Sequence, residues 1–213
     1  MDQNLKTLMD LKIEKTRNAL IKNNMEAHIV ENAEDLRALI SQLIKPGTSV
    51  SVGGSQTLFE TGIIDQLRGM PITFNDRYEP NLSAKEIDEV HRQAFFADYL
   101  ITSSNAITED GLLYNVDGKG NRTAALIFGP KHVIVVAGMN KIVPDLEAAI
   151  QHVENVAAPA NAIRLNKETP CTNFGHCAHC KSKDRICSHY VVTGRQGTPG
   201  RISVILVKES LGY

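Results

Sequence analysis

The segment Thr48-Ser49-Val50-Ser51-Val52-Gly53-Gly54-Ser55 decides the fold class. Its β-branched residues predict a strand over residues 48–52, and the two glycines predict a tight turn directly after it. Apolar residues then recur at helical spacing and predict one helix; they are Leu58, Phe59, Ile63 and Leu67. A strand, a glycine turn and a helix in succession form one unit of a layered α/β protein.

The rest of the chain repeats this alternation. We expect further strands at residues 26–30, 71–74, 99–102, 111–116, 124–128, 133–137 and 202–207. Because helical patterns separate most of these strands, parallel pairing is expected. The closely spaced strands between residues 99 and 137 indicate that part of the sheet is antiparallel. The prediction is a single three-layer α/β/α domain over residues 1–213, with a mostly parallel mixed sheet.

Helix starts carry recognisable signals. Asn32 is expected to cap the helix after the first strand, and Ser83 with Glu86 forms a capping box that starts a helix reaching Ala97. Pro144 suits the first position of a later helix. A long first helix is expected from the apolar face of Leu5, Met9, Ile13 and Leu20.

Composition and charge exclude several classes of protein. The 213 residues carry a net charge of −1, no tryptophan and only 5% aromatic residues, which argues against nucleic-acid binding. No apolar run reaches the roughly 18 residues that a membrane span needs. The N-terminal residues form a charged helical pattern and do not resemble an export signal. These observations predict a cytoplasmic protein.

One segment, residues 167–190, breaks the alternation and reads as an irregular insert. It holds all four cysteines, at Cys171, Cys177, Cys180 and Cys187, and almost no apolar periodicity. In a reducing compartment, such clustered cysteines favour metal binding over disulfides. The spacing C-x5-C-x2-C-x6-C has only one tight pair, which fits a 4Fe–4S cluster better than the paired knuckles of a zinc site. Zinc and four reduced thiols are the alternatives.

Positive residues accompany these cysteines. Lys181, Lys183 and Arg185 stand between the last two of them, where their charge favours thiolates and an anionic cluster. A solvated loop face explains the same residues. His176 and His179 are expected outside the ligand set, because four cysteines already suffice.

Polar residues at the ends of predicted strands indicate a small-anion site. Gly53, Gly54 and Ser55 offer backbone N–H groups before a helix, a geometry that suits a phosphate or carboxylate, although a capped turn explains them equally well. Asn105 and Arg122 follow two later strands, and Arg122 could clamp a carboxylate. Glu109 could serve as a base or nucleophile. Simple turns and a surface ion pair are the alternative for this region.

Several motifs in order resemble the lactate-utilisation (LUD) domain family. They are residues 53–58, Thr102-Ser-Ser-Asn-Ala-Ile-Thr-Glu-Asp-Gly111, Gly118-Lys-Gly-Asn-Arg122, residues 129–143, residues 158–164 and Leu211-Gly-Tyr213. The resemblance implies a fold like that of ribose-5-phosphate isomerase and the CoA transferases. The cysteine segment is similar to the cluster-bearing insert of some members, which supports iron–sulfur over zinc.

The resemblance also implies a function. Members are associated with the oxidation of L-lactate to pyruvate within multi-protein iron–sulfur systems, so electron transfer and other redox subunits are expected. The motifs imply ligand-binding residues at Gly53, Gly54, Ser55, Gln56, Thr57, Asn105, Gly120, Asn121, Arg122 and Lys141. The segment around Glu109 looks like that of the catalytic glutamate of CoA transferases, where the glutamate attacks a thioester.

Three functions follow as hypotheses. The first is an iron–sulfur redox component for lactate or a related 2-hydroxy acid. The second is a non-redox isomerase or CoA-transferase-like enzyme with a structural metal, and the third is a cluster-dependent binding or sensor module. A homo-oligomer is compatible with each. No flavin or nicotinamide fingerprint is present in the sequence, so hydride transfer would require another subunit.

Overall fold

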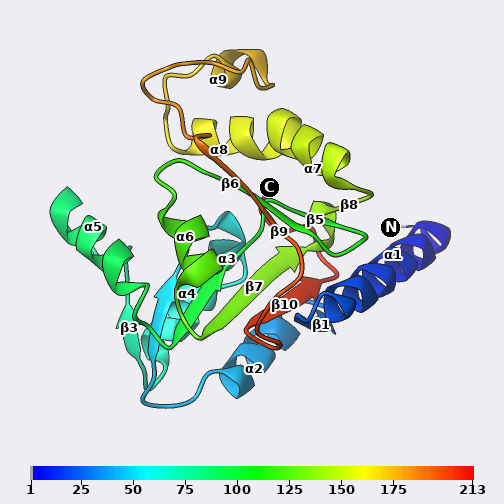
Figure 1. The fold of residues 1–213 in the computed structure, drawn as a ribbon, viewed down its shortest axis with the longest axis horizontal. Coiled ribbons are helices and arrows are strands. Elements are labelled where there is room, and N and C mark those ends of the chain that lie inside the picture. Colours follow the sequence, from blue (N-terminus) through cyan, green and yellow to red (C-terminus); the bar gives the residue numbers. More distant parts are fainter. Residues whose placement is uncertain (1) are drawn as a thin grey trace.

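The computed structural model describes residues 2–213 as an α/β protein with a mostly parallel central sheet between helical layers. Figure 1 shows this sheet in the middle of the molecule, with α1 on one side, α2 below it, and α7, α8 and α9 above the ends of the strands. None of the helices between residues 2 and 213 combines the length and the apolar character that a membrane crossing needs.

The strands are short. Seven of them lie close to predicted ranges, whereas the strands at residues 106–108, 142–143 and 189–193, all in the smaller sheet, were not predicted. They are β1 (Glu26–Val30), β2 (Ser49–Val52), β3 (Thr73–Asn75), β4 (Tyr99–Thr102), β5 (Ala106–Thr108), β6 (Leu113–Asp117), β7 (His132–Gly138), β8 (Ile142–Val143), β9 (His189–Thr193) and β10 (Ile202–Val207).

The helices connect these strands. They are α1 (Gln3–Lys22), α2 (Ala33–Leu43), α3 (Gln56–Glu60), α4 (Ile63–Gly69), α5 (Ala84–Gln93), α6 (Asn121–Phe128), η1 (Met139–Lys141), α7 (Leu146–His152), η2 (Val153–Ala157), α8 (Ala158–Arg164) and α9 (Cys171–Phe174).

The strands form two sheets. The larger has the order β1-β10-β7-β4-β2-β3, and every pair in it is parallel. The smaller has the order β8-β5-β6-β9, in which β5–β6 and β6–β9 are antiparallel. The expected antiparallel pairing is therefore present, but it lies in a second sheet, because residues 106–117 turn back on themselves instead of returning through a helix.

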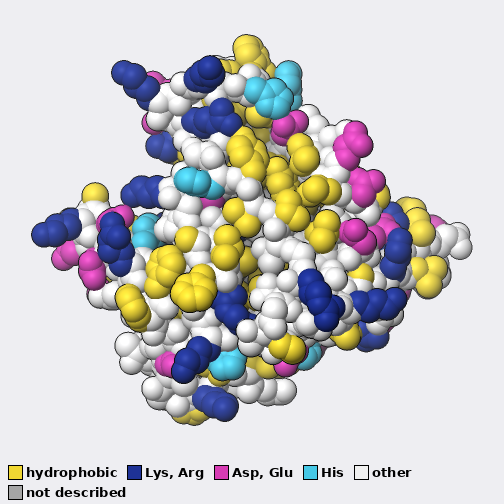
Figure 2. Space-filling view, viewed as in Figure 1, with side chains coloured by type: hydrophobic (Ala, Val, Ile, Leu, Met, Phe, Trp, Pro, Cys, Tyr) yellow, Lys and Arg dark blue, Asp and Glu magenta, His cyan; other side chains and the backbone are white. Residues whose placement is uncertain are grey.

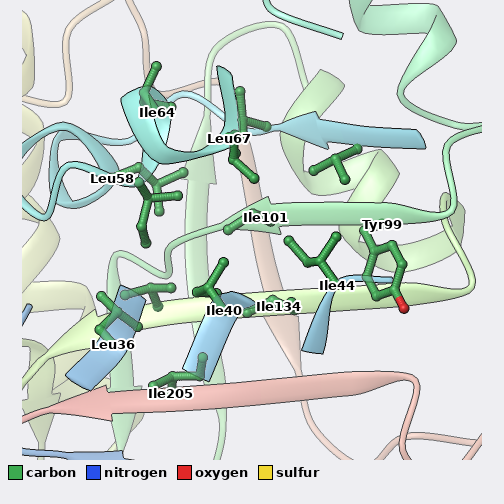
Figure 3. Packing of buried hydrophobic residues seen from close by; sticks show 14 of the residues in the cluster. Leu36, Ile40, Ile44, Leu58, Ile64, Leu67, Tyr99, Ile101, Ile134 and Ile205 are labelled. Carbon is green, nitrogen blue, oxygen red and sulfur yellow. The ribbon is translucent and has the colours of Figure 1, made fainter. Parts of the chain in front are cut away.

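Alternate side chains of the parallel strands feed two cores. On one face, Ile101, Ile134 and Ile205 pack against α2, α3 and α4. Figure 3 shows this cluster, with Leu36 and Ile40 of α2, and Ile44 directly after it, beside the strands. On the other face, Leu100, Val133, Val135 and Val204 pack against α1 and α6. A third, smaller cluster joins the second sheet to α7, η2 and α8. Burial on both faces explains the near-continuous apolar runs of these strands.

Two helix starts confirm the sequence signals. The side chain of Asn32 accepts hydrogen bonds from the backbone of Glu34 and Asp35, and Ser83 with Glu86 forms the capping box. The helix after Pro144 has Asp145 as its N-cap, with its side chain accepting from Ala148, so Pro144 lies one position before the cap.

Three predicted elements were wrong in type or extent. Residues 124–128 are helical in α6 and not a strand; a short apolar run does not distinguish the two. The single helix expected over Leu58–Leu67 is broken into α3 and α4, because Gly62 adopts a left-handed conformation (φ 71°). The helix that begins after Ser83 ends at Gln93, before the expected Ala97.

Candidate functional site

A cleft of about 380 Å³ opens at the carboxyl ends of the central parallel strands. Four neighbouring strands each lead into it: β3 to Arg77, β2 to Gly54, β4 to Ser103 and β7 to Lys141. Chain order reverses across β2, since its neighbours are β3 and β4. Such a switch point leaves a crevice between the loops of an open parallel sheet, where α/β proteins bind ligands.

The structure brings most of the predicted ligand residues to this cleft. Those that line it are Gly54, Ser55, Gln56, Asn105, Asn121, Arg122 and Lys141. Gly53, Thr57 and Gly120 are their direct neighbours in the chain and do not themselves line it. Residues that were not predicted as ligand residues also line it: Arg77, Tyr78 and His91 lie outside the family-like motifs, and Lys119, Asn161, Arg164 and Tyr213 lie within them. They lie on loops and helices that only the tertiary fold brings together.

Gly53 is required by close packing behind the cleft. A Cβ atom at this position would lie 2.5 Å from Thr102 Oγ1 and 2.9 Å from Cγ of Arg122. Both neighbours are themselves fixed, since Thr102 is fully buried and Arg122 is held by hydrogen bonds. The absence of a side chain lets the β2 turn approach β4 and α6.

The guanidinium of Arg122 organises the cleft and does not offer a free fork to a ligand. Its Nη1 donates to the Ser103 carbonyl (3.0 Å) and to Asn115 Oδ1 (2.5 Å). Its Nη2 donates to Asn105 Oδ1 and to the Val116 carbonyl, both at 3.0 Å. Burial lowers the pKa of Arg122, which the nearby carboxylate of Asp117 opposes. We assign Arg122 a positioning role, because its N–H groups are directed at protein acceptors.

Asn105 is one of the groups that Arg122 positions. Its Oδ1 accepts from Arg122 and from the backbone N–H of Val116 (2.9 Å). Within residues 2–213 the amide nitrogen of Asn105 donates to no protein group, which leaves two N–H donors in a residue that lines the cleft.

Lys141 is a buried amine, only 2% exposed. Its Nζ donates to Thr57 Oγ1 and to Ser103 Oγ, each at 2.9 Å. Burial, with a smaller contribution from the positive charge of Arg122, lowers the pKa of Lys141 to about 7, against the opposing effect of Glu60. The amine is therefore close to half-protonated near neutral pH, and an anion beside it would favour the ammonium form.

The cleft carries more positive than negative charge. Its lining includes five cationic residues, Arg77, Lys119, Arg122, Lys141 and Arg164, and one carboxylate, Asp117. Figure 2 shows Lys and Arg side chains along the margin of the molecule between α8 and α5. Of the five, only Arg122 has a carboxylate within 4.0 Å among the described residues. Clefts lined by one sign of charge attract the opposite ion, so this cleft is suited to an anion.

His91 adds a buried imidazole to the same wall. Its side chain belongs to a residue that is 9% exposed, and neither ring nitrogen has a hydrogen-bond partner among residues 2–213. Burial lowers the pKa of His91, and Arg77 and Lys119 lower it further. The imidazole is therefore neutral at pH 7 and leaves the positive charge of the cleft to the lysines and arginines.

Glu109 does not line the cleft. It follows β5 of the second sheet and pairs with Lys15 of α1, whose Nζ lies 2.7 Å from Oε2. Because β5 is not one of the parallel strands of the large sheet, its carboxyl end leads elsewhere. Glu109 therefore forms an ion pair between α1 and the second sheet, and it lies apart from the predicted ligand residues that line the cleft.

The four cysteines line one small pocket beside α8. Cys171, Cys177, Cys180 and Cys187 share it with Thr169 and Arg185. All four are free thiols and are partly buried. Thr169 Oγ1 lies 3.2 Å from Cys171 Sγ, and the backbone N–H of His179 donates to Cys177 Sγ (3.4 Å). Among residues 2–213 no three of the cysteine sulfur atoms lie within 4.8 Å of one another, but all four line the same pocket. They supply the donor set of a four-thiolate metal centre, and hydrogen bonds to sulfur are typical of bound thiolates.

Arg185 fixes the backbone of this cysteine loop. Its guanidinium donates to the carbonyls of Cys180 and Cys187, the latter at 2.6 Å from Nε, and to Tyr190 Oη at 2.6 Å. Arg185 thus holds the loop by hydrogen bonds in addition to supplying charge. His179 offers a different metal group with Cys177 and Glu154, whose ligand atoms lie within 4.8 Å of one another. That group uses only one of the four cysteines.

The cysteine pocket and the cleft share a wall. Ile186 lines both. Gly118 of the β6–α6 loop lies beside the backbone of Ile186, where a Cβ would be in ordinary contact, 3.4 Å from the Ile186 carbonyl oxygen. The backbone N–H of Ser188 donates to the Asp117 carbonyl (2.9 Å), and β9 continues this contact along β6. The second sheet therefore fixes the cysteine loop against the cleft.

Comparison with known proteins agrees with this architecture. The sequence profile of the LUD domain matches residues 13–207. A crystal structure of a DUF162 family protein from Deinococcus radiodurans is similar over 93% of this chain and 98% of that chain, with a TM-score of 0.54 and 18% identity. A translation initiation factor eIF-2B from Pyrococcus horikoshii OT3 is similar over 54% of this chain and 48% of that chain, with a TM-score of 0.36 and 21% identity. No curated protein sequence matches the chain.

Proposed function

The chain belongs to the LUD domain family, and on that premise we propose that it is an iron–sulfur redox component in the oxidation of lactate or a related 2-hydroxy acid. The observation that carries the proposal is the wall formed by Ile186, which separates the cysteine pocket from the anion cleft. Electron transfer requires proximity between donor and acceptor, and this arrangement supplies it.

The cleft is suited to hold the carboxylate of such an acid. Lys141 Nζ and the free amide N–H groups of Asn105 supply donors, and Arg122 keeps the surrounding backbone and Asn105 in place. Charge-assisted hydrogen bonds to a carboxylate are stronger than those between neutral groups. The excess of cationic residues draws the anion into the cleft.

Cys171, Cys177, Cys180 and Cys187 would hold the metal centre, with Arg185 fixing their loop. A 4Fe–4S cluster bound there would supply one-electron transfer. Oxidation of a 2-hydroxy acid to a 2-oxo acid releases two electrons and two protons. We therefore propose that the chain works with other redox subunits, one of which carries the two-electron acceptor.

Metal content and spectroscopy of the anaerobically purified chain test the proposal. We expect about four iron and four sulfide ions per chain, a yellow-brown colour with broad visible absorption, and a paramagnetic signal on reduction. Replacing Cys187 by Ser should remove the iron and the colour. One zinc per chain with no iron, under the same conditions, would refute the redox role.

The shared wall also favours a second candidate, a binding module whose affinity depends on the cysteine centre. Loss of the centre would free the loop that contains Ile186 and so alter the cleft. This candidate predicts that metal removal changes the affinity for an anion and that the complete system shows no turnover of a 2-hydroxy acid. Turnover that depends on this chain would favour the redox component.

A further inference from the structure

We infer that the acid bound in this cleft carries a second anionic group, so that the substrate class is a phosphorylated or dicarboxylic 2-hydroxy acid rather than lactate itself. The inference rests on the proposed function and deepens it by naming the substrate class. Its basis is the number and position of cationic side chains that have no carboxylate partner, together with the size of the cleft.

Charge is the first argument. Arg77, Lys119 and Arg164 line the cleft, and each lacks a carboxylate within 4.0 Å among residues 2–213, as does Lys141. A single carboxylate supplies one negative charge, whereas a phosphate adds about 1.5 to 2 more at pH 7. Lactate would therefore leave most of this positive charge uncompensated.

Repulsion between these cations is the second argument. Arg77 lies close enough to Arg122 and to His91 to lower the pKa of both, and Arg122 has the same effect on Lys141. Arg77, Arg122 and Lys141 all line the cleft, and we call these three residues the cationic row. Like charges held together in a partly desolvated site raise the free energy of the folded protein, and an anion with two charged ends relieves the repulsion at both ends of the row.

The outer end of the row is built to receive a group. The guanidinium of Arg77 lies over the turn after β2, where a Cβ at Gly54 would be 3.2 Å from its Nη1. The ring of Tyr78 supports Arg77, with its centroid 5.3 Å from the guanidinium carbon. Stacking on an aromatic ring fixes a guanidinium without using its N–H donors, so they stay available for a phosphate or carboxylate.

Size is the third argument. A volume of about 380 Å³ lies in the range of roughly 300–1,000 Å³ that holds ligands of drug size. A three-carbon acid fills only a fraction of that space. The same cleft accommodates a 2-hydroxy acid whose carboxylate reaches Lys141 while a second anionic group reaches Arg77, Lys119 or Arg164.

Calorimetric titration of the anaerobically purified full chain with five probes tests the inference. The probes are L-lactate, L-malate, 3-phosphoglycerate, glycerol 3-phosphate and inorganic phosphate. We expect 3-phosphoglycerate or malate to bind at least about tenfold more tightly than lactate, because each adds one charge-assisted contact. They should also exceed glycerol 3-phosphate and phosphate, which lack the carboxylate.

Variants locate the second group. At least one of the variants Arg77→Met and Arg164→Met should bind the tighter of the two ligands, 3-phosphoglycerate or malate, about tenfold or more weakly than the wild type. The affinity for lactate should change by less than about twofold in both variants. Lys45→Met removes the same charge from an exposed residue outside the cleft and should change neither. Arg122 is unsuitable as a test, because its loss would disrupt the backbone that it holds.

Three results would overturn the inference. The first is equal affinity for lactate and for the dianions. The second is that the variants lose as much affinity for lactate as for the dianion. The third is an affinity for inorganic phosphate that matches the affinity for 3-phosphoglycerate. The metal assay is independent of these titrations. A zinc-containing chain that prefers the dianion would remove the redox proposal and keep the two-anion cleft, whereas an iron–sulfur chain that does not discriminate would do the reverse.

Discussion

Replacement of Lys141 by methionine should abolish a specific pH dependence of stability. The pKa of Lys141 falls from an ordinary value of 10.5 to about 7 in the folded protein, because the amine is buried beside Arg122. The unfolded chain therefore binds more protons than the folded one between pH 7 and about pH 10. Stability that depends on this group must rise with pH across that window and level off below pH 7, where the amine is protonated in both states.

The magnitude follows from the size of the shift. A pKa unit corresponds to about 1.4 kcal/mol, so burial of the protonated amine costs on the order of 5 kcal/mol at low pH. Between pH 6 and pH 9 the wild-type free energy of unfolding should gain roughly 2 to 3 kcal/mol from Lys141 alone. The methionine variant lacks this gain, although it also loses two hydrogen bonds to Thr57 and Ser103, worth about 1 kcal/mol each at any pH.

Urea unfolding at four pH values between 6 and 9.5 measures this directly. The quantity of interest is the difference between the wild-type and variant free energies of unfolding, since histidines and cysteines that titrate in both proteins cancel. Lys45→Met is the matched control, because Lys45 is exposed and its loss should leave the difference independent of pH. A Lys141→Met difference that is also flat within about 0.5 kcal/mol would refute the low pKa. An anion that binds at Lys141 should suppress the slope, because it restores the ammonium form.

Three further predictions concern packing, the cysteine loop and Glu109. Gly53→Ala should lower the free energy of unfolding in urea by about 1–3 kcal/mol, because the added methyl group would clash with Thr102. Gly69→Ala is the control: its added methyl group meets no atom within 4 Å, so the free energy of unfolding should stay the same or rise slightly. Arg185→Met should reduce the amount of metal that the chain retains after gel filtration with a chelator, because the carbonyls of Cys180 and Cys187 lose their hydrogen-bond donor. Lys183→Met is the control, since it removes the same charge from the loop and should retain as much metal as the wild type. Glu109→Gln should lower the free energy of unfolding by no more than about 1 kcal/mol, because its partner Lys15 is largely exposed. The affinity for 3-phosphoglycerate should not change. A tenfold loss of that affinity would place Glu109 in the ligand site.

The parallel sheet could be predicted from the sequence because its central strands are buried on both faces. The predicted ranges for β1, β4 and β10 coincide with the structure; β4 and β10 are mainly apolar and fully buried, whereas β1 is an edge strand that carries Glu26 and His28. Residues 124–128 have the same composition and yet are helical. One contact that stabilises the helix comes from outside the run: the carboxylate of Asp117 accepts from the backbone N–H of Thr123 (3.1 Å) in the first turn of α6.

The candidate site was accessible only in part. Residues that directly follow parallel strands, such as Gly54 and Asn105, could be assigned to one edge of the sheet because parallel strands end together. Arg77 also follows a parallel strand, β3, but no motif singled it out, and Arg164 belongs to a helix far along the chain. Glu109 also follows a strand, but that strand belongs to the second sheet, and no local pattern distinguishes the two.

Asp117 connects the two halves of the site. Its backbone carbonyl accepts from Ser188, directly after the last cysteine, while its carboxylate lies 3.9 Å from Nε of Arg122 and caps α6. Arg122 in turn holds Asn105 and the carbonyls of Ser103 and Val116. A displacement of the cysteine loop must therefore act on the residue that orders the cleft. Since Asp117 is also the only carboxylate among the described residues that line the cleft, the link between the two sites and the charge balance of the ligand site depend on the same side chain.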